Sequence, residues 1–304
     1  MPNRPLLYLS RNRTARRFME TSPLAARLTR RFISGNRLDD GLAVCRQLAA
    51  SGMLTALDHL GENVTSLEDA ARSRDAYLAA LRELNKIGAG ATISLKLTQF
   101  GLDISVGACV DNVSAVVKLA AETGTRIEVD MESSEYTAKT LGIIEDLHGR
   151  YPGKVRAVIQ AYLYRSEADI VRLNGLGVPV RLCKGAYIEP AAVAMPAKRD
   201  VDANYVKLAR VLLDKGEYPA LATHDEKMTA AALAFVKDRG IAADRFEFQM
   251  LYGVRRDLQR RLADEGYRVR LYVPYGDAWY PYFMRRLAER PANVLFLLRN
   301  LLRA

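Results

Sequence analysis

Hydrogen-bonding and charged side chains recur at the ends of short apolar runs along this chain. Lys96 ends the run ATISLK and Asp130 ends RIEVD. An amine and a carboxylate at such positions can move protons or can form a structural ion pair, and the two residues alone do not distinguish these roles. Further polar residues in the same setting are Gln160, Arg181, Lys184, Thr223, His224, Gln249 and Tyr272.

Each of these residues also has a structural explanation. A lone histidine such as His224 is more often a hydrogen-bonded structural residue than a ligand. Gln160 is harder to explain in this way, because a buried amide without partners costs about 1–3 kcal/mol. The agreement among seven separate runs favours one shared site over seven unrelated contacts.

A second polar group lies near the end of the chain, within DAWYPYFMRRLAER. Tyr282, Arg285, Arg286 and Glu289 have the spacing i, i+3, i+4, i+7, which places them on one face of a helix. Two adjacent arginines can bind one carboxylate in a bidentate manner. The face is either a solvated basic surface or the reader of a small anionic ligand.

The elements that must position these groups alternate between strands and helices, which indicates a parallel sheet wrapped by helices. We predict helices from Ser66 to Gly88 and from Asp111, Ser134, Ser166, Asp200, Asp225 and near Val254. The predicted strands are Met53–Leu60, Ala91–Leu97, Arg126–Met131, Arg156–Leu163, Pro179–Lys184, Pro219–His224, Arg245–Leu251 and Val269–Tyr275.

Eight such units in about 250 residues match a (β/α)₈ TIM-like barrel, in which chemistry occurs at the C-terminal ends of the strands. We expect an N-terminal helical arm over residues 1–50 and the barrel over 51–304, with the last barrel helix covering the C-terminal mouth. A dinucleotide fold is disfavoured, because the stretch from Gly88 to Gly90 follows a helix and precedes a strand.

The composition disfavours three classes of protein, namely disulfide-rich, metal-binding and membrane-spanning proteins. The three cysteines are far apart and include no CxxC pair, so we expect neither a disulfide framework nor a metal site. No uncharged stretch approaches the roughly 18 apolar residues that a membrane-spanning helix needs. The formal charge is +10, and its N-terminal part fits a solvated segment, a nucleic-acid arm, a membrane contact or a presequence. The N-terminal arginines are Arg4, Arg11, Arg13, Arg16 and Arg17.

Several longer strings together resemble the proline dehydrogenase family, and in particular its short monofunctional bacterial members. The likeness covers nearly all of the chain beyond the N-terminal arm. The strings are SLKL, VDME, VIQAYL, VRLCKGAY, LATHDEKM, FEFQMLYGVR and YVPYGDAWYPYFMRRLAERPANV.

This resemblance implies an FAD-dependent oxidation of L-proline to Δ1-pyrroline-5-carboxylate, with hydride transfer from C5 to flavin N5. It identifies Asp130 and Arg181 as active-site residues, the latter beside N5. The matched substrate contacts are Lys96, Tyr272, Tyr282, Arg285 and Arg286, the two arginines holding the carboxylate. The matched FAD contacts are Met131, Gln160, Arg181, Lys184, Gly185, Ala186, Thr223, His224 and Glu289.

The family also implies electron transfer to a membrane quinone. We therefore expect a cytoplasmic protein that can contact the inner face of the membrane, and no nucleic-acid partner. The sequence departs from the family pattern at Ile188, which leaves the adenine and pyrophosphate contacts in loop 188–199 unassigned.

Two other functions remain open from the residues alone. A Schiff-base aldolase on the same fold would use Lys96 or Lys184 as its nucleophile. A nucleic-acid-binding module would use the N-terminal arginines.

Overall fold

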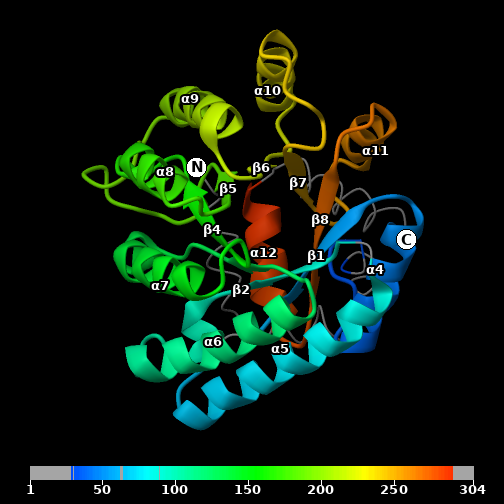
Figure 1. Ribbon diagram of the computed structural model, residues 1–304, viewed down its shortest axis with the longest axis vertical. Coiled ribbons are helices and arrows are strands. Elements are labelled where there is room, and N and C mark those ends of the chain that lie inside the picture. The colour runs from blue at the N-terminus through cyan, green and yellow to red at the C-terminus, as the bar shows by residue number, and fades with distance from the viewer. Residues whose placement is uncertain (1–28, 30, 62–63, 89, 290–304) are drawn as a thin grey trace.

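Eight parallel strands form a closed barrel in the computed structural model, and neighbours in the sequence are neighbours in the sheet (Figure 1). The structure describes residues 29, 31–61, 64–88 and 90–289, with side chains as far as Met284. The strands are β1 (Leu54–His59), β2 (Thr92–Leu95), β3 (Ile127–Val129), β4 (Val155–Gln160), β5 (Val180–Cys183), β6 (Ala220–Ala222), β7 (Glu247–Leu251) and β8 (Val269–Tyr275). The predicted (β/α)₈ class is confirmed.

Helices surround the barrel as a ring, and α12 crosses its centre in the view of Figure 1. The described α-helices are α4 (Leu38–Ala50), α5 (Leu67–Ile87), α6 (Val106–Glu122), α7 (Thr137–Arg150), α8 (Ser166–Gly175), α9 (Lys198–Lys215), α10 (Glu226–Asp238), α11 (Arg256–Asp264) and α12 (Trp279–Glu289). Short 3-10 helices η1 (Leu97–Phe100) and η2 (Ser134–Tyr136) follow β2 and β3.

Helices α5, α6 and α10 each begin after a residue whose side chain caps the first turn, and these caps explain which of the predicted starts of these helices are correct. Ser66 and Asp225 accept hydrogen bonds from the first turns of α5 and α10, as predicted. The predicted start at Asp111 is wrong, because Ser105 accepts from Ala108 N and starts α6 one and a half turns earlier. The stretch from Ser134 forms η2 before α7 begins.

Along the strands, apolar side chains that point outward alternate with polar side chains that point into the barrel, which is unusual for this fold. Apolar residues such as Ile93 and Leu95 pack outward against the helices, and form the large core of the molecule. Their neighbours Thr92 and Ser94 instead hydrogen-bond across the barrel interior, to Glu128 and Asp130. A TIM barrel usually fills its interior with branched apolar residues, so here the core lies between strands and helices while the interior is polar.

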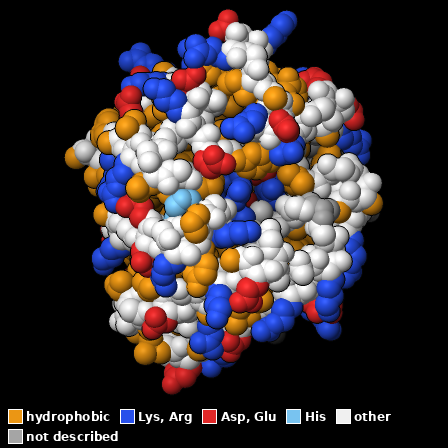
Figure 2. Space-filling view, viewed as in Figure 1, with side chains coloured by type: hydrophobic (Ala, Val, Ile, Leu, Met, Phe, Trp, Pro, Cys, Tyr) orange, Lys and Arg blue, Asp and Glu red, His pale blue; other side chains and the backbone are white. Residues whose placement is uncertain are grey.

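Buried ion pairs fill that interior. Arg270 donates to Glu247 through two nitrogens, at 2.8 and 3.0 Å, and Arg156 Nη1 donates to the same carboxylate at 2.6 Å. Burial raises the pKa of Glu247, but the two arginines outweigh it and lower the pKa well below its usual range. Basic side chains also lie in a hollow near the centre of the face drawn in Figure 2.

Helix α12 closes the C-terminal mouth of the barrel. Its residues Trp279, Tyr280, Tyr282, Phe283 and Met284 are buried and belong to one apolar cluster. The cluster also includes Leu60, which follows β1, and has Leu251 at the end of β7 and Tyr272 within β8 packed against it. The helix is therefore placed where the chemistry of such barrels occurs.

The buried pairing predicts a large cost for losing one partner. Arg270→Met should lower the free energy of unfolding by about 3–5 kcal/mol, because Glu247 loses its bidentate partner in a dry environment. Lys207→Met is the matched control: Lys207 pairs with Glu167 at 2.6 Å, both are exposed, and the expected change is about 0–1 kcal/mol. Urea denaturation measures the change in the free energy of unfolding for both variants. Similar changes in the two variants would show that Arg270 and Glu247 are not a buried pair.

Candidate active site

Asp130 lies at the centre of the polar cluster at the mouth. Its Oδ1 accepts hydrogen bonds from Ser94 Oγ at 2.8 Å and from an Arg181 guanidinium nitrogen. Its Oδ2 accepts from Lys96 Nζ at 3.1 Å and from the Tyr272 hydroxyl at 2.8 Å. Residues on or next to β2, β3, β5 and β8 therefore converge on one carboxylate.

The surrounding charges fix the ionisation of Asp130. Burial alone would raise its pKa, but the Lys96 ammonium and the Arg181 guanidinium outweigh burial and lower the pKa to about 2. Hydrogen bonds from Ser94 and Tyr272 act in the same direction. Asp130 is therefore a carboxylate at neutral pH.

Arg181 connects this cluster to the barrel interior. Its Nη1 donates to Gln249 Oε1 at 3.1 Å and lies 3.3 Å from Glu128 Oε2, while its Cζ lies 5.6 Å from the centroid of the Tyr272 ring. Burial lowers the pKa of Arg181, but Asp130 and Glu128 outweigh it and raise the pKa. The guanidinium is a fixed positive charge just below the mouth.

Gln160 and the loop after β5 form a second part of the mouth. Gln160 Nε2 donates to the Glu132 carbonyl at 2.9 Å, and its Oε1 accepts from Ala186 N at 3.4 Å. Gly185 has φ +117°, and a Cβ there would lie 2.3 Å from the Tyr162 ring. Only glycine therefore lets the loop lie this close to Tyr162.

Lys184 does not join the Asp130 cluster. Its Nζ contacts Asp202 Oδ1 at 2.5 Å and Asp225 Oδ2 at 2.9 Å. Burial raises the pKa of Asp225, but Lys184 outweighs it, through a hydrogen bond and its charge, and the pKa is lowered. Lys184 thus links the β5 end to α9 and the cap of α10.

The remaining predicted cofactor contacts lie on neighbouring strand ends. Met131 and Thr223 are buried, and Thr223 Oγ1 accepts from Asp225 N at 3.0 Å. His224 Nε2 accepts from Leu251 N at 2.8 Å, which joins the β6 end to β7. Gln249 lies within β7 and donates to Glu128 and Glu247, so it is deeper in the barrel than the sequence interpretation placed it.

The predicted helix face is described only in part. Tyr282 is buried on α12 within the apolar cluster that contains Phe283. Arg285, Arg286 and Glu289 belong to α12, and the structure describes their backbone but not their side chains. Their roles stay predictions.

Two acidic residues of the site were missed at the sequence level. Asp58, near the end of β1, lies fully buried 3.7 Å from Lys96 Nζ, so the first strand also contributes to the mouth. Glu128 lies on β3 one pleat below Asp130 and contacts Arg181 and Arg156. The alternation of polar and apolar residues in IEVD could have revealed Glu128.

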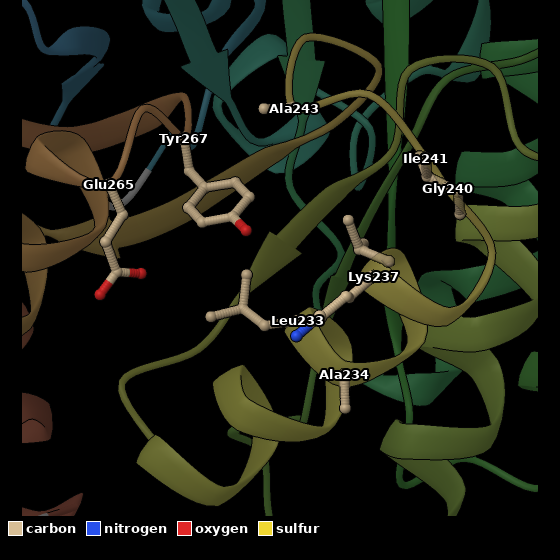
Figure 3. A pocket seen from close by; sticks show the side chains of 9 residues that line it. Leu233, Ala234, Lys237, Gly240, Ile241, Ala243, Glu265 and Tyr267 are labelled. Carbon is tan, nitrogen blue, oxygen red and sulfur yellow. The ribbon is translucent and has the colours of Figure 1, made fainter.

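A separate pocket on the outer wall does not resemble this site. Figure 3 shows that it is lined by Leu233 and Lys237 of α10, the loop at Gly240 and Ile241, and Tyr267. These residues lie between α10 and the segment after α11. The described polar convergence is therefore at the mouth and not in this pocket.

A closed (β/α)₈ barrel with paired ammonium, carboxylate and guanidinium groups at its C-terminal mouth defines a barrel enzyme. The proline dehydrogenase family model matches residues 42–299, and the chain belongs to that family. It is an oxidoreductase that oxidises proline, and membership supports a flavin cofactor.

Relatives and solved structures agree with this assignment. The chain is 42% identical over 271 residues to proline dehydrogenase 2 of Bacillus subtilis, with 89% of each chain covered. It is 39% identical over 280 residues to proline dehydrogenase of Deinococcus radiodurans, covering 91% and 90%. A crystal structure of proline utilization A from Bdellovibrio bacteriovorus, inactivated by N-propargylglycine, matches with TM-score 0.82 and 27% identity, over 90% of this chain and 33% of that one.

The lowered pKa of Asp130 predicts a contribution to acid stability. A carboxyl whose folded pKa is depressed stabilises the fold above its ordinary value, 3.8, and loses that contribution as the pH falls towards about 2. Between these values, the free energy of unfolding should fall more steeply with decreasing pH for the unmodified protein than for Asp130→Asn. Denaturant titrations across this window give both slopes, and equal slopes would contradict the charge assignment.

Proposed function

We propose that the protein is an FAD-dependent proline dehydrogenase that transfers hydride from C5 of L-proline to flavin N5, forming Δ1-pyrroline-5-carboxylate. The observation that carries the proposal is the convergence of Lys96, Asp130, Arg181 and Tyr272 at the mouth of a barrel of this family. This is the first step of proline catabolism.

The donor chemistry of the mouth fits a flavin. A flavin ring carries carbonyl oxygens and ring nitrogens that need hydrogen-bond donors, and Gln160 and Arg181 supply an amide and a guanidinium on adjacent strands. Met131, Thr223 and His224 would complete the contacts, with Gly185, Ala186 and Lys184 on the loop. When bound, the flavin supplies the electron acceptor, and the protein supplies orientation and electrostatics.

Arg181 would stabilise the negative charge that the cofactor gains. Its guanidinium is held from several sides, by Asp130, Gln249, Glu128 and Ser94, and so needs little reorganisation during the reaction. Pre-oriented charge in a water-poor site is worth more than the same charge in water.

Substrate recognition is assigned to Lys96, Tyr272, Tyr282 and the two arginines of α12. Tyr272 and Lys96 both contact Asp130, so their positions are fixed before substrate arrives. We propose that Arg285 and Arg286 bind the carboxylate, that Glu289 lies near the flavin, and that α12 thereby excludes water.

The aldolase alternative is less favoured by the charges around Lys96. A Schiff-base lysine must lose its proton before it attacks a carbonyl. Burial lowers the pKa of Lys96, but Asp58 and Asp130 outweigh burial and raise the pKa above its usual value. The amine is therefore held as an ammonium and is not poised as a nucleophile.

We propose a membrane quinone as the electron acceptor. The described helices include none that is both long and apolar enough to cross a bilayer. Contact with the membrane would then be peripheral, supported by the +10 formal charge of the chain. The arginine-rich N-terminal segment, on which nucleic-acid binding would rest, lies outside the described residues.

Purified protein should carry a flavin that proline reduces. Anaerobic titration with L-proline should bleach the visible flavin absorption to completion, with one equivalent of pyrroline carboxylate formed per flavin. Glycine or lactate at the same concentration should leave the spectrum unchanged. A colourless protein that cannot be reconstituted with FAD, or a flavin that proline does not reduce, would refute the proposed function.

Arg285→Met and Arg286→Met should each lower kcat/KM for proline by at least about tenfold, or ~1.4 kcal/mol, because each removes a donor to the substrate carboxylate. Arg256→Met on α11, a helix of the outer ring, is the control and should not change kcat/KM. Steady-state assays with an artificial acceptor measure all three. Wild-type kinetics in both α12 variants would remove the proposed carboxylate site.

A further inference from the structure

Asp58 is the most unusual carboxylate of the described residues. It lies on β1 in register with Ser94 of β2 and Pro274 of β8, and its side chain has no exposed surface. Neither of its carboxylate oxygens has a hydrogen-bond partner within the described part of the chain. The Tyr272 hydroxyl is near enough to lower the pKa of Asp58, but it donates its single hydrogen to Asp130 at 2.8 Å. A buried charge without hydrogen bonds is costly, so the residue needs a reason to be there.

Lys96 is the only cation within 4 Å of Asp58 among the described residues, at 3.7 Å, and it is closer to Asp130, at 3.1 Å. Arg181 also favours the charged form of Asp58, while the charge of Asp130 opposes it. Burial raises the pKa of three tyrosine hydroxyls, and the charge of Asp58 also raises it: Tyr272 and Tyr275 from β8, and Tyr77 from α5.

The two acidic groups that share Lys96 therefore differ in proton affinity. Asp130 has four hydrogen-bonding partners and a pKa lowered to about 2. Burial raises the pKa of Asp58, and the nearby cations do not cancel that effect. Paired carboxyls whose environments separate their proton affinities commonly divide into a fixed charge and a proton carrier.

Other groups at the mouth are less suited to accept a proton. Lys96 is held as an ammonium by its two carboxylates. Glu132 is also buried with a raised pKa, but its oxygens already accept from Thr98 N at 3.2 Å and Thr98 Oγ1 at 2.7 Å. His224 Nε2 accepts from the Leu251 amide.

We propose that Asp58 accepts the proton that the substrate ammonium must lose before oxidation, directly or through one water molecule. This inference rests on the proposed function, because it requires a secondary amine that is oxidised. The N–H bond of the ammonium breaks and an O–H bond forms on Asp58, which becomes a neutral carboxylic acid. The freed nitrogen lone pair then stabilises the iminium as C5 loses hydride, so the substrate is oxidised by two electrons and the flavin is reduced.

Asp58→Asn tests this role, because the amide preserves shape but cannot take up the proton. At pH 7, kcat/KM for proline should fall by about 10²-fold or more. The loss should shrink steadily as the pH rises towards the pKa of the free amine, because neutral proline no longer needs an acceptor. Flavin content and the spectrum of the oxidised protein should match those of the unmodified protein.

Glu128→Gln is the matched control, because Glu128 is also a buried carboxylate but contacts arginines below the mouth. Any loss of kcat/KM in Glu128→Gln should stay the same as the pH rises, because Glu128 does not take up the substrate proton. The proposal would be overturned if Asp58→Asn lowered kcat/KM by the same factor at every pH, or did not change kcat/KM at all. Absence of flavin reduction in the unmodified protein would instead refute the proposed function.

A second measurement applies if Asp58→Asn does not fold. Infrared difference spectra of the unmodified protein, recorded under anaerobic conditions before and after reduction by proline, should gain a band from a protonated carboxylic acid. The band should shift when the protein contains ¹³C-labelled aspartate. Absence of a labelled band would also overturn the proposal.

Discussion

The buried charges inside the barrel are held in place by pairing with one another. Four carboxylates and four cations fill the described interior. Each is costly to bury alone, and the pairs become favourable only when geometry and hydrogen bonds are both satisfied. The set comprises Asp58, Glu128, Asp130 and Glu247, with Lys96, Arg156, Arg181 and Arg270.

This network has a direction along the barrel axis. At its lower end Arg270 donates to Glu247 and to the carbonyls of Thr55 and Gly90. At the mouth the same chain of contacts ends in Asp58, whose oxygens have no hydrogen-bond partners among the described residues. A rigid charged interior can therefore hold Arg181 and Lys96 in place while one acidic group stays able to exchange a proton.

Much of the fold follows from the sequence, because strand periodicity and capping residues act locally. The strand Val269–Tyr275 is predicted to the residue, and Ser66 and Asp225 mark helix starts. The sequence also predicts that the polar residues at the strand ends meet near Asp130, because parallel strands in a barrel all end at the same face. What could not be read is how deep each side chain lies: Gln249 is an interior residue, and Asp58 looks like any acid before a loop until Lys96 is placed beside it.

A crystal structure of the flavin-bound protein with proline, obtained without oxygen, would show directly where both molecules bind. We expect the flavin ring at the C-terminal mouth, with Arg181 and Gln160 at its edge. Proline should lie between the ring and α12, with its nitrogen towards Asp58 and Lys96. A flavin on the outer wall would contradict the proposed function, and a proline nitrogen directed away from both residues would contradict the proposed role of Asp58.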